Sequence, residues 1–116
     1  MFTIRKIFEF SAAHQLHGLP PGHQCGRLHG HNYCVEVVLK AENLDVTGFV
    51  VDYGELKPLR DHLDDRYEHK NLNDIYEQPS AEQIAKELYR WCKKTWPQTS
   101  MVRVSETPKT WAEYSE

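Results

Sequence analysis

Apolar and polar residues alternate along two stretches in the first part of the chain, residues 2–13 and residues 31–42. Side chains at positions i and i+2 of a strand point to the same face, so this period predicts two strands that each bury one face. A loop that contains glycines and prolines, Gln15–Leu28, separates them. We expect an antiparallel hairpin with a long loop, and long loops in compact domains often carry function.

Helical spacing replaces this alternation in the middle of the chain. Asp52 predicts a helix start with Glu55 as its capping-box partner, and leucines at helical steps continue the helix to about residue 65. On this helix His62 is expected to be a surface residue. Ser80 and Gln83 form the same start signal for a second helix with an apolar stripe.

Short apolar or alternating stretches predict three further strands, at residues 49–51, 101–106 and 111–115. The two helices follow one another instead of alternating with strands. This order predicts an α+β fold with an antiparallel sheet. A chain of 116 residues is long enough for one hydrophobic core, so residues 1–116 are expected to form a single domain.

Charge and composition narrow the class of protein. The formal net charge of −3 gives no general attraction to nucleic acid or to an anionic membrane. No apolar run approaches the roughly 20 residues that span a bilayer, and charged residues interrupt the N-terminal stretch before a signal-like segment develops. Cys25, Cys34 and Cys92 lack the spacing of a disulfide framework, which favours reduced thiols and a cytoplasmic protein. Cys34 and Cys92 are expected to be small buried apolar residues.

Histidines are concentrated around the predicted hairpin. His29 and His31 share one face of the second strand, and antiparallel pairing returns His14 to their side. Three imidazoles suit a zinc ion that keeps a fourth position open for chemistry. Cys25 then has two interpretations: a reactive thiol beside the metal, or the fourth ligand of a closed structural zinc site. A further interpretation treats the histidines as ordinary polar loop residues.

The motifs around these residues resemble the 6-pyruvoyltetrahydropterin synthase family nearly from end to end. The resemblance rests on segments that follow one another in the family's order: Phe8–His14, Gly22–His31, Thr47–Tyr53, His69–Asn73, Pro79–Glu82 and Val104–Thr107. It implies the tunnelling fold (T-fold), an antiparallel four-stranded sheet with two helices on one face. In this fold the sheets of three subunits join into an oligomeric barrel. Two such trimers usually stack into a homohexamer, a dimer of trimers with active sites at subunit boundaries.

The resemblance also implies roles for individual residues. His14, His29 and His31 would be the zinc ligands, Cys25 the catalytic proton acceptor, and His69 its partner in proton transfer. Cys25 stands four residues before His29. This short spacing favours the carboxy-forming branch of the family, the 6-carboxytetrahydropterin synthases of queuosine biosynthesis.

Further residues match the family's substrate-binding and relay positions. Glu106 matches a carboxylate of the family that binds the pterin and takes part in catalysis. A carboxylate suits this binding because an aminopyrimidinone edge offers it two N–H donors. Glu68 stands where the family has an aspartate before the histidine. It is either a relay group that orients His69 or a solvated loop carboxylate. Arg27 is a candidate for binding the triphosphate of the substrate.

The implied reaction converts 7,8-dihydroneopterin triphosphate to 6-carboxy-5,6,7,8-tetrahydropterin and releases acetaldehyde and triphosphate, with Zn²⁺ and no organic cofactor. Two alternatives remain: a 6-pyruvoyltetrahydropterin synthase on the same scaffold, and a non-catalytic zinc- or pterin-binding module. Release of acetaldehyde separates the first hypothesis from both alternatives.

Overall fold

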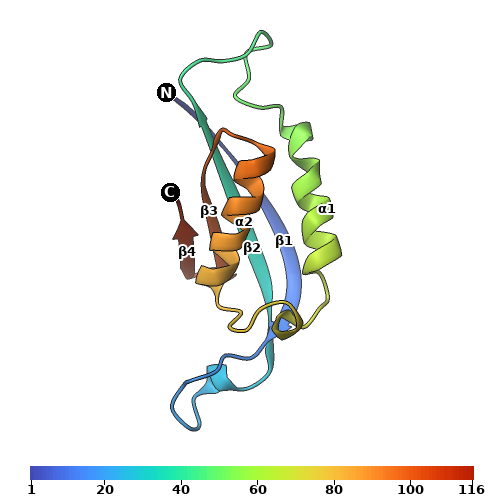
Figure 1. Ribbon diagram of the computed structural model, residues 1–116, viewed down its shortest axis with the longest axis vertical. Helices are drawn as coiled ribbons and strands as arrows, with labels where there is room; N and C mark the ends of the chain where they lie inside the picture. Colours follow the sequence, from blue (N-terminus) through green and yellow to red (C-terminus); the bar gives the residue numbers. More distant parts are fainter.

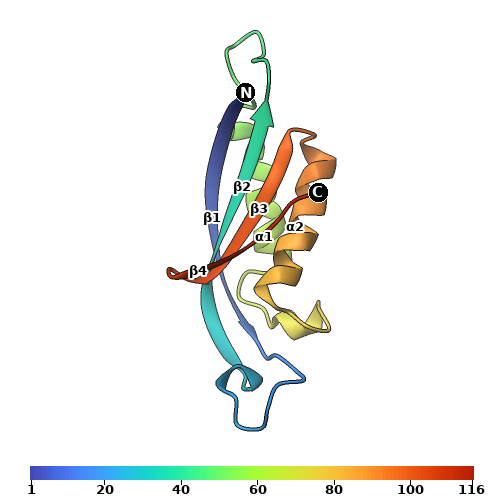
Figure 2. The ribbon, with the colours of Figure 1, turned by 90° about the vertical axis from the view of Figure 1, so that its left-hand side faces the viewer.

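The computed structural model describes residues 1–116 as one four-stranded antiparallel sheet with two helices on one of its faces (Figures 1 and 2). The elements in chain order, with the 3-10 turns written η, are β1 (Phe2–His14), η1 (Gln24–Gly26), β2 (His29–Ala41), η2 (Tyr53–Leu56), α1 (Lys57–Arg66), η3 (Leu72–Asp74), α2 (Ala81–Thr95), β3 (Thr99–Thr107) and β4 (Thr110–Tyr114). The strands lie in the order β1-β2-β3-β4. The predicted α+β class and antiparallel sheet are confirmed.

The β1–β2 hairpin dominates the shape of the molecule. Its strands pair along their whole length, from Phe2 opposite Ala41 to His14 opposite His29. The hairpin extends beyond the helices, as Figure 2 shows, and the molecule measures 56 × 24 × 23 Å. The ends of the strands that hold the histidines lie beside the start of α2, close to the loop that joins β1 to β2.

Alternation along the strands separates a covered face of the sheet from an uncovered one. Phe10 and Tyr33 point to the covered face, where their rings stack with centroids 4.7 Å apart, and Tyr67 stacks on Phe10 at 5.2 Å. On the uncovered face Glu36 is buried and pairs with Arg5 at 2.9 Å. The uncovered face is thus no ordinary solvent-facing surface, because its central carboxylate is almost removed from water.

The second helix forms as its sequence predicts. The Ser80 hydroxyl accepts a hydrogen bond from the Gln83 amide at 3.3 Å and caps α2. The apolar stripe of α2 packs into the core and includes Cys92, which is fully buried. Burial raises the pKa of the Cys92 thiol to about 12, so this cysteine is an apolar core residue as expected.

The first helix begins later than predicted. The Asp52 carboxylate accepts a hydrogen bond from the Gly54 amide at 2.8 Å and starts the 3-10 turn η2, and no capping box forms with Glu55. The regular helix α1 begins only at Lys57, with Pro58 in its first turn. Proline lacks an N–H, so it fits the first turn of a helix, where that donor would be unpaired.

The predicted strand at residues 49–51 is wrong. The segment bends, and the Asp45 carboxylate holds the preceding turn by accepting hydrogen bonds from the amides of Thr47 and Phe49 at 2.9 Å. Val50 and Val51 are nevertheless buried in the core. The apolar run reflects burial of a connecting segment, which a short run alone does not distinguish from a strand.

Two side chains lie in environments that differ from those predicted. His62 is half-buried and stacks on Trp91 of α2, with ring centroids 4.3 Å apart, because α1 turns this side toward α2. Cys34 lies half-buried on the uncovered face of the sheet, where burial and the nearby Glu9 and Glu36 raise its pKa. Neither α1 nor α2 has the length and apolarity that crossing a bilayer requires.

Candidate active site

Three histidines gather where β1 ends and β2 begins. His14 is the last residue of β1 and pairs directly with His29, the first residue of β2, while His31 follows two positions later on the same face. One ring nitrogen from each lies within 4.8 Å of the others. His14 is fully buried and the other two are partly exposed. The hairpin register thus brings together the three predicted ligands.

Backbone carbonyls fix the orientation of two of these rings. His14 Nδ1 donates to the Pro79 carbonyl oxygen at 2.7 Å, and His29 Nδ1 donates to the Arg27 carbonyl oxygen at 2.6 Å. A carbonyl oxygen only accepts, so each Nδ1 carries its proton and each Nε2 of a neutral ring presents a lone pair. Hydrogen bonds of this kind orient histidines that bind metals in proteins.

The same two rings face each other in a way that requires a cation. His14 Nε2 and His29 Nε2 are 2.9 Å apart. Two lone pairs at this distance repel each other, and the contact is favourable only with a proton or a metal ion at the pair. The chemistry of these donors therefore fits a metal ion bound through both Nε2 atoms.

The third imidazole has an unpaired nitrogen. His31 Nε2 is buried without a hydrogen-bond partner, although Glu106 Oε2 lies 3.4 Å away. Burial lowers the pKa of His31, with Glu106 acting in the opposite direction and the two neighbouring histidines adding to the decrease. A neutral imidazole with a free nitrogen is the form that binds a metal.

The cluster contains neither Cys25 nor a carboxylate. Three imidazole nitrogens suit zinc and other borderline metals and are poor ligands for calcium or magnesium. In proteins, three ligands and a free position are typical of catalytic zinc, whereas structural zinc has four protein ligands. The residues present therefore fit a zinc ion with one open position, and the alternative of a closed site with Cys25 as fourth ligand has no support in this geometry.

Cys25 lies in the 3-10 turn η1 of the β1–β2 loop and is half-buried. Its carbonyl oxygen accepts a hydrogen bond from the Leu16 amide at 3.0 Å. Its own amide donates to His23 Nδ1 at 3.1 Å. The loop that carries Cys25 is therefore fastened to the chain immediately after the histidine that ends β1.

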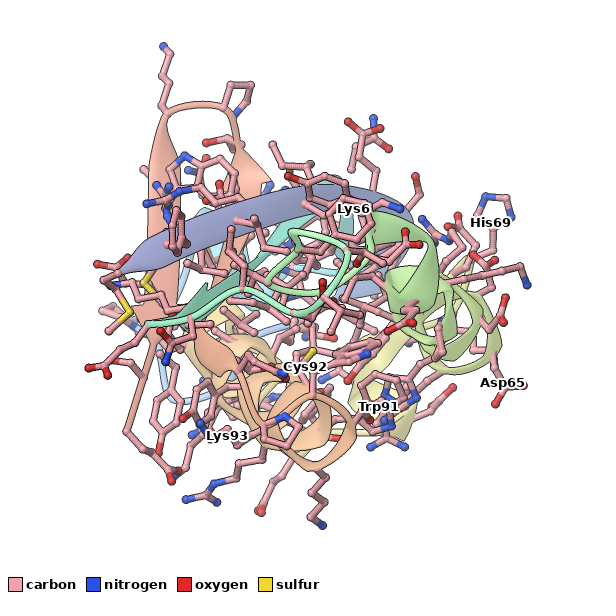
Figure 3. All side chains as sticks on the ribbon, turned by 90° about the horizontal axis from the view of Figure 1, so that it is seen from above. Lys6, Asp65, His69, Trp91, Cys92 and Lys93 are labelled. Atoms are coloured by element: carbon pink, nitrogen blue, oxygen red, sulfur yellow. The ribbon has the colours of Figure 1, made fainter.

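His69 lies at the rim of the molecule, where Figure 3 shows its labelled side chain pointing outward beside α1. Its side chain is 81% exposed, and its Nε2 is 3.1 Å from Glu68 Oε1. His69 has a φ of 56°, the only positive φ outside glycine. Its amide nevertheless bonds the Ser11 carbonyl at 2.6 Å, so the strained backbone is held against β1.

The Glu68 carboxylate is partly buried and contacts Ser11, Arg60 and His69. Its Oε1 accepts a hydrogen bond from the Ser11 amide at 3.3 Å, and its Oε2 lies 3.9 Å from the guanidinium of Arg60. The side chain reaches β1 and His69 together. Despite the extra methylene of glutamate, the carboxylate lies against the imidazole of His69.

The remaining predicted residues line different hollows of the single chain. His69 and His31 line one hollow with Asn32, and Arg27 lines a second, within the β1–β2 loop. Glu106 lines a third with Trp111. One chain therefore brings Glu106 to the histidine cluster through His31, but does not gather Arg27, His69 and Glu106 into one cavity.

Sequence reasoning missed three side chains that support the site. Arg60 of α1 approaches Glu68, and Asn73 and Gln78 hydrogen-bond the backbone just after His14. Asn73 closes the segment His69–Asn73, so its place beside the predicted histidine was a usable signal. No local sequence pattern indicates the roles of Gln78 and Arg60. Their hydrogen-bond partners, His17 and Glu9, lie more than 50 residues away in the chain.

Comparisons with known proteins agree with this geometry. The profile of the family described as 6-pyruvoyl tetrahydropterin synthase matches residues 3–116. The chain is 37% identical to the 6-carboxy-5,6,7,8-tetrahydropterin synthase of Synechocystis sp., over 98% of this chain and 93% of the relative. It is 32% identical to the enzyme of that name from Bacillus subtilis, over 97% of this chain and 84% of the relative.

The solved structure of Caenorhabditis elegans 6-pyruvoyl tetrahydropterin synthase superposes with a TM-score of 0.86 at 28% identity, covering 99% of this chain and 95% of that one. The sheet and both helices are thus shared over nearly the whole length of the two chains. With its sequence, fold and histidine cluster in agreement, this chain belongs to the 6-pyruvoyl tetrahydropterin synthase family.

Proposed function

We propose that this chain is a zinc-dependent lyase that converts 7,8-dihydroneopterin triphosphate to 6-carboxy-5,6,7,8-tetrahydropterin, with release of acetaldehyde and triphosphate. The observation that carries the proposal is the cluster of three imidazoles with Glu106 3.4 Å from His31. The names of the relatives from Synechocystis sp. and Bacillus subtilis support the carboxy-forming reaction, as does the short spacing between Cys25 and His29. The product would enter queuosine biosynthesis.

His14, His29 and His31 would hold the zinc ion through their Nε2 atoms. When bound, zinc supplies a Lewis acid for the hydroxyl groups on the side chain of the substrate. The carbonyl oxygens of Pro79 and Arg27 keep the rings of His14 and His29 in the tautomer that this binding needs. The site would therefore be organised before substrate arrives.

Cys25 would remove a proton from the substrate carbon next to the pterin ring, and His69 would take part in the same proton transfer. Glu68 would orient His69 through its Oε1, which lies 3.1 Å from His69 Nε2. The Ser11 amide holds the carboxylate in place. Glu68 would thus act on the proton transfer only through His69.

Glu106 would bind the pterin. A carboxylate accepts both N–H groups of an aminopyrimidinone edge in a bidentate pair, which fixes both position and orientation. Glu106 also lies against His31, so the pterin would be placed beside the histidine cluster. Arg27, exposed in the β1–β2 loop, would meet the negative charge of the triphosphate.

The active site would be completed between subunits of a homohexamer, a dimer of trimers. Two observations support this assembly. His69 and Glu106 line separate hollows of one chain, and Ile7 and Trp111 are apolar residues exposed on the uncovered face of the sheet. Apolar exposure of this kind is typical of surfaces that bind another chain. We also propose a cytoplasmic location, in keeping with three free cysteines.

The deciding experiment incubates the zinc-loaded protein with 7,8-dihydroneopterin triphosphate and measures acetaldehyde together with the pterin product. The wild type should release one acetaldehyde for each 6-carboxytetrahydropterin formed. Cys25→Ala should keep its zinc and lose about 10²–10⁴-fold in rate, the usual contribution of a proton-transfer group. Cys34→Ala, which alters a half-buried thiol on the other face of the sheet, is the matched control and should retain activity.

Other outcomes identify the alternatives. A pterin product without acetaldehyde indicates a 6-pyruvoyltetrahydropterin synthase. Absence of turnover, together with loss of zinc in Cys25→Ala, indicates a structural zinc site in a non-catalytic module and overturns the proposal.

A further inference from the structure

The free edge of β1 is covered by the segment that carries His69. The Ser11 carbonyl accepts from the His69 amide at 2.6 Å, and the Ala13 amide donates to the Lys70 carbonyl at 3.0 Å. Ser11 and Ala13 are alternate residues, whose backbone groups point to the same edge of a strand. The segment that follows α1 therefore runs along β1 up to the residue before His14.

Beyond this point side-chain amides replace backbone partners. Asn73 accepts from the Gln15 amide at 2.8 Å and donates to the Gln15 carbonyl at 2.9 Å. Gln78 accepts from the His17 amide at 2.9 Å and donates to the His17 carbonyl at 3.0 Å. A primary amide carries an acceptor and donors like a peptide unit, so each side chain imitates one residue of a neighbouring strand. Gln15 and His17 continue the alternate positions of the β1 edge.

The opposite edge of this stretch bonds the turn that carries Cys25. The Leu16 amide donates to the Cys25 carbonyl at 3.0 Å, and the Gln15 side chain donates to the Gly26 carbonyl at 2.8 Å. Residues 15–17 are thus held on one edge by two amide side chains and hold η1 on the other.

This arrangement does more than protect an exposed strand edge. Proteins usually protect such edges with charge, proline or bulges. Here both backbone groups of Gln15 and of His17 are paired, and the residue between them, Leu16, bonds Cys25 itself. The rest of the loop contains Gly18 and Gly22 at positive φ and has no regular structure before η1. Residues 15–17 are therefore the fixed part of the loop.

We infer that Asn73 and Gln78 are positioning residues for Cys25. They keep residues 15–17 extended, and this stretch sets the Cys25 turn relative to His14. Both amides belong to the connection between α1 and α2, which also bears His69. The inference rests on the proposed function, which assigns Cys25 its role. We call Asn73, Gln78 and residues 15–17 the amide clamp.

The test compares Asn73→Ala and Gln78→Ala with Gln83→Ala, which removes an exposed amide from α2, in the zinc-loaded full chain. Two quantities are measured: hydrogen exchange of the Leu16 amide, and kcat and KM for acetaldehyde release. In each clamp variant the Leu16 amide hydrogen should exchange at least about tenfold faster, although neither Leu16 nor Cys25, whose carbonyl accepts its hydrogen bond, is mutated. Each should lower kcat by about 10–100-fold with KM and zinc content unchanged, since small displacements of catalytic groups cost this much. Gln83→Ala should change neither quantity.

Further variants and outcomes decide the inference. Asn73→Asp keeps the acceptor and loses the donor, so it should fall between wild type and Asn73→Ala. Unchanged exchange of Leu16 in both alanine variants, or faster exchange with unchanged kcat, overturns the inference. If Asn73→Ala does not fold, Gln78→Ala decides by the same criteria.

Failure of the proposed function has a different signature. A wild type that releases no acetaldehyde overturns that function, and the amide clamp is then judged by exchange of Leu16 and by the rate at which iodoacetamide alkylates Cys25. Both rates should change in Asn73→Ala. If either remains at the wild-type value, the clamp does not position Cys25.

Discussion

Zinc should raise the thermal stability of this chain, because only the folded state brings the three histidines together. In the folded chain the Nε2 atoms of His14 and His29 lie 2.9 Å apart with both Nδ1 atoms donating to carbonyls. His31 contributes a buried nitrogen without a hydrogen-bond partner. A bound metal satisfies all three nitrogens, whereas the unfolded chain offers separated imidazoles that bind it far more weakly.

The size of the effect follows from linkage. A ligand at about 100 times its Kd stabilises the folded state by about 2.7 kcal/mol when the unfolded chain does not bind it. Unfolding entropy of about 2.1 cal/mol/K per residue gives about 0.24 kcal/mol/K for 116 residues. The unfolding midpoint should therefore rise by about 11 °C.

Differential scanning calorimetry of chelator-treated protein, with and without added zinc, measures this shift. His14→Ala removes the buried member of the cluster and should abolish it. His17→Ala removes an exposed histidine outside the cluster and should preserve it. A wild type whose midpoint does not move with zinc, or an equal rise in His14→Ala, refutes the reasoning.

Two further predictions concern side chains outside the cluster. Burial lowers the pKa of His62 from 6.5, so the folded state binds fewer protons than the unfolded state near this pH. The contribution of a neutral His62 to folding stability is therefore complete above pH 6.5 and is lost as the pH falls through the folded-state pKa. His62→Phe, which keeps an aromatic ring on Trp91, should therefore lose less unfolding free energy than wild type between about pH 7 and pH 5 in urea titrations, and an equal loss would contradict this assignment. Arg60→Gln removes the cation beside Glu68 and should lower kcat by up to roughly fivefold. Lys57→Gln breaks a comparable ion pair on the same helix and should leave kcat unchanged; equal effects would remove any role for Arg60.

The sequence predicted best those features that depend on a periodic pattern with one buried face. A register slip by one residue would expose Phe10 and Tyr33, so the alternation determines which residues share a face of β1 and β2. The same rule places His29 and His31 on one face, and the hairpin places His14 opposite His29. The histidine cluster was therefore predictable, because its ligands lie within regular structure.

The errors occurred where burial and local pattern do not correspond. Val50 and Val51 are buried without belonging to the sheet. A short apolar run does not distinguish a buried connecting segment from a buried strand. His62 was assigned to the surface because a lone polar residue on a helix is usually solvated. Its stacking on Trp91 depends on how α1 packs against α2, which no pattern within α1 specifies.

The free edge of β1 explains why residues from distant parts of the sequence meet here. Its partners from Glu9 to His17 are, in order, Arg60, Glu68, His69, Lys70, Asn73 and Gln78. An edge strand has unpaired N–H and C=O groups that require partners. Two of the partners are His69, the predicted proton-transfer partner of Cys25, and Glu68, which is predicted to orient His69; the strand itself ends in His14. The bonds that close this edge therefore also set the distance between these two residues and the histidine cluster, so that the contacts which the fold requires also hold the proposed site together.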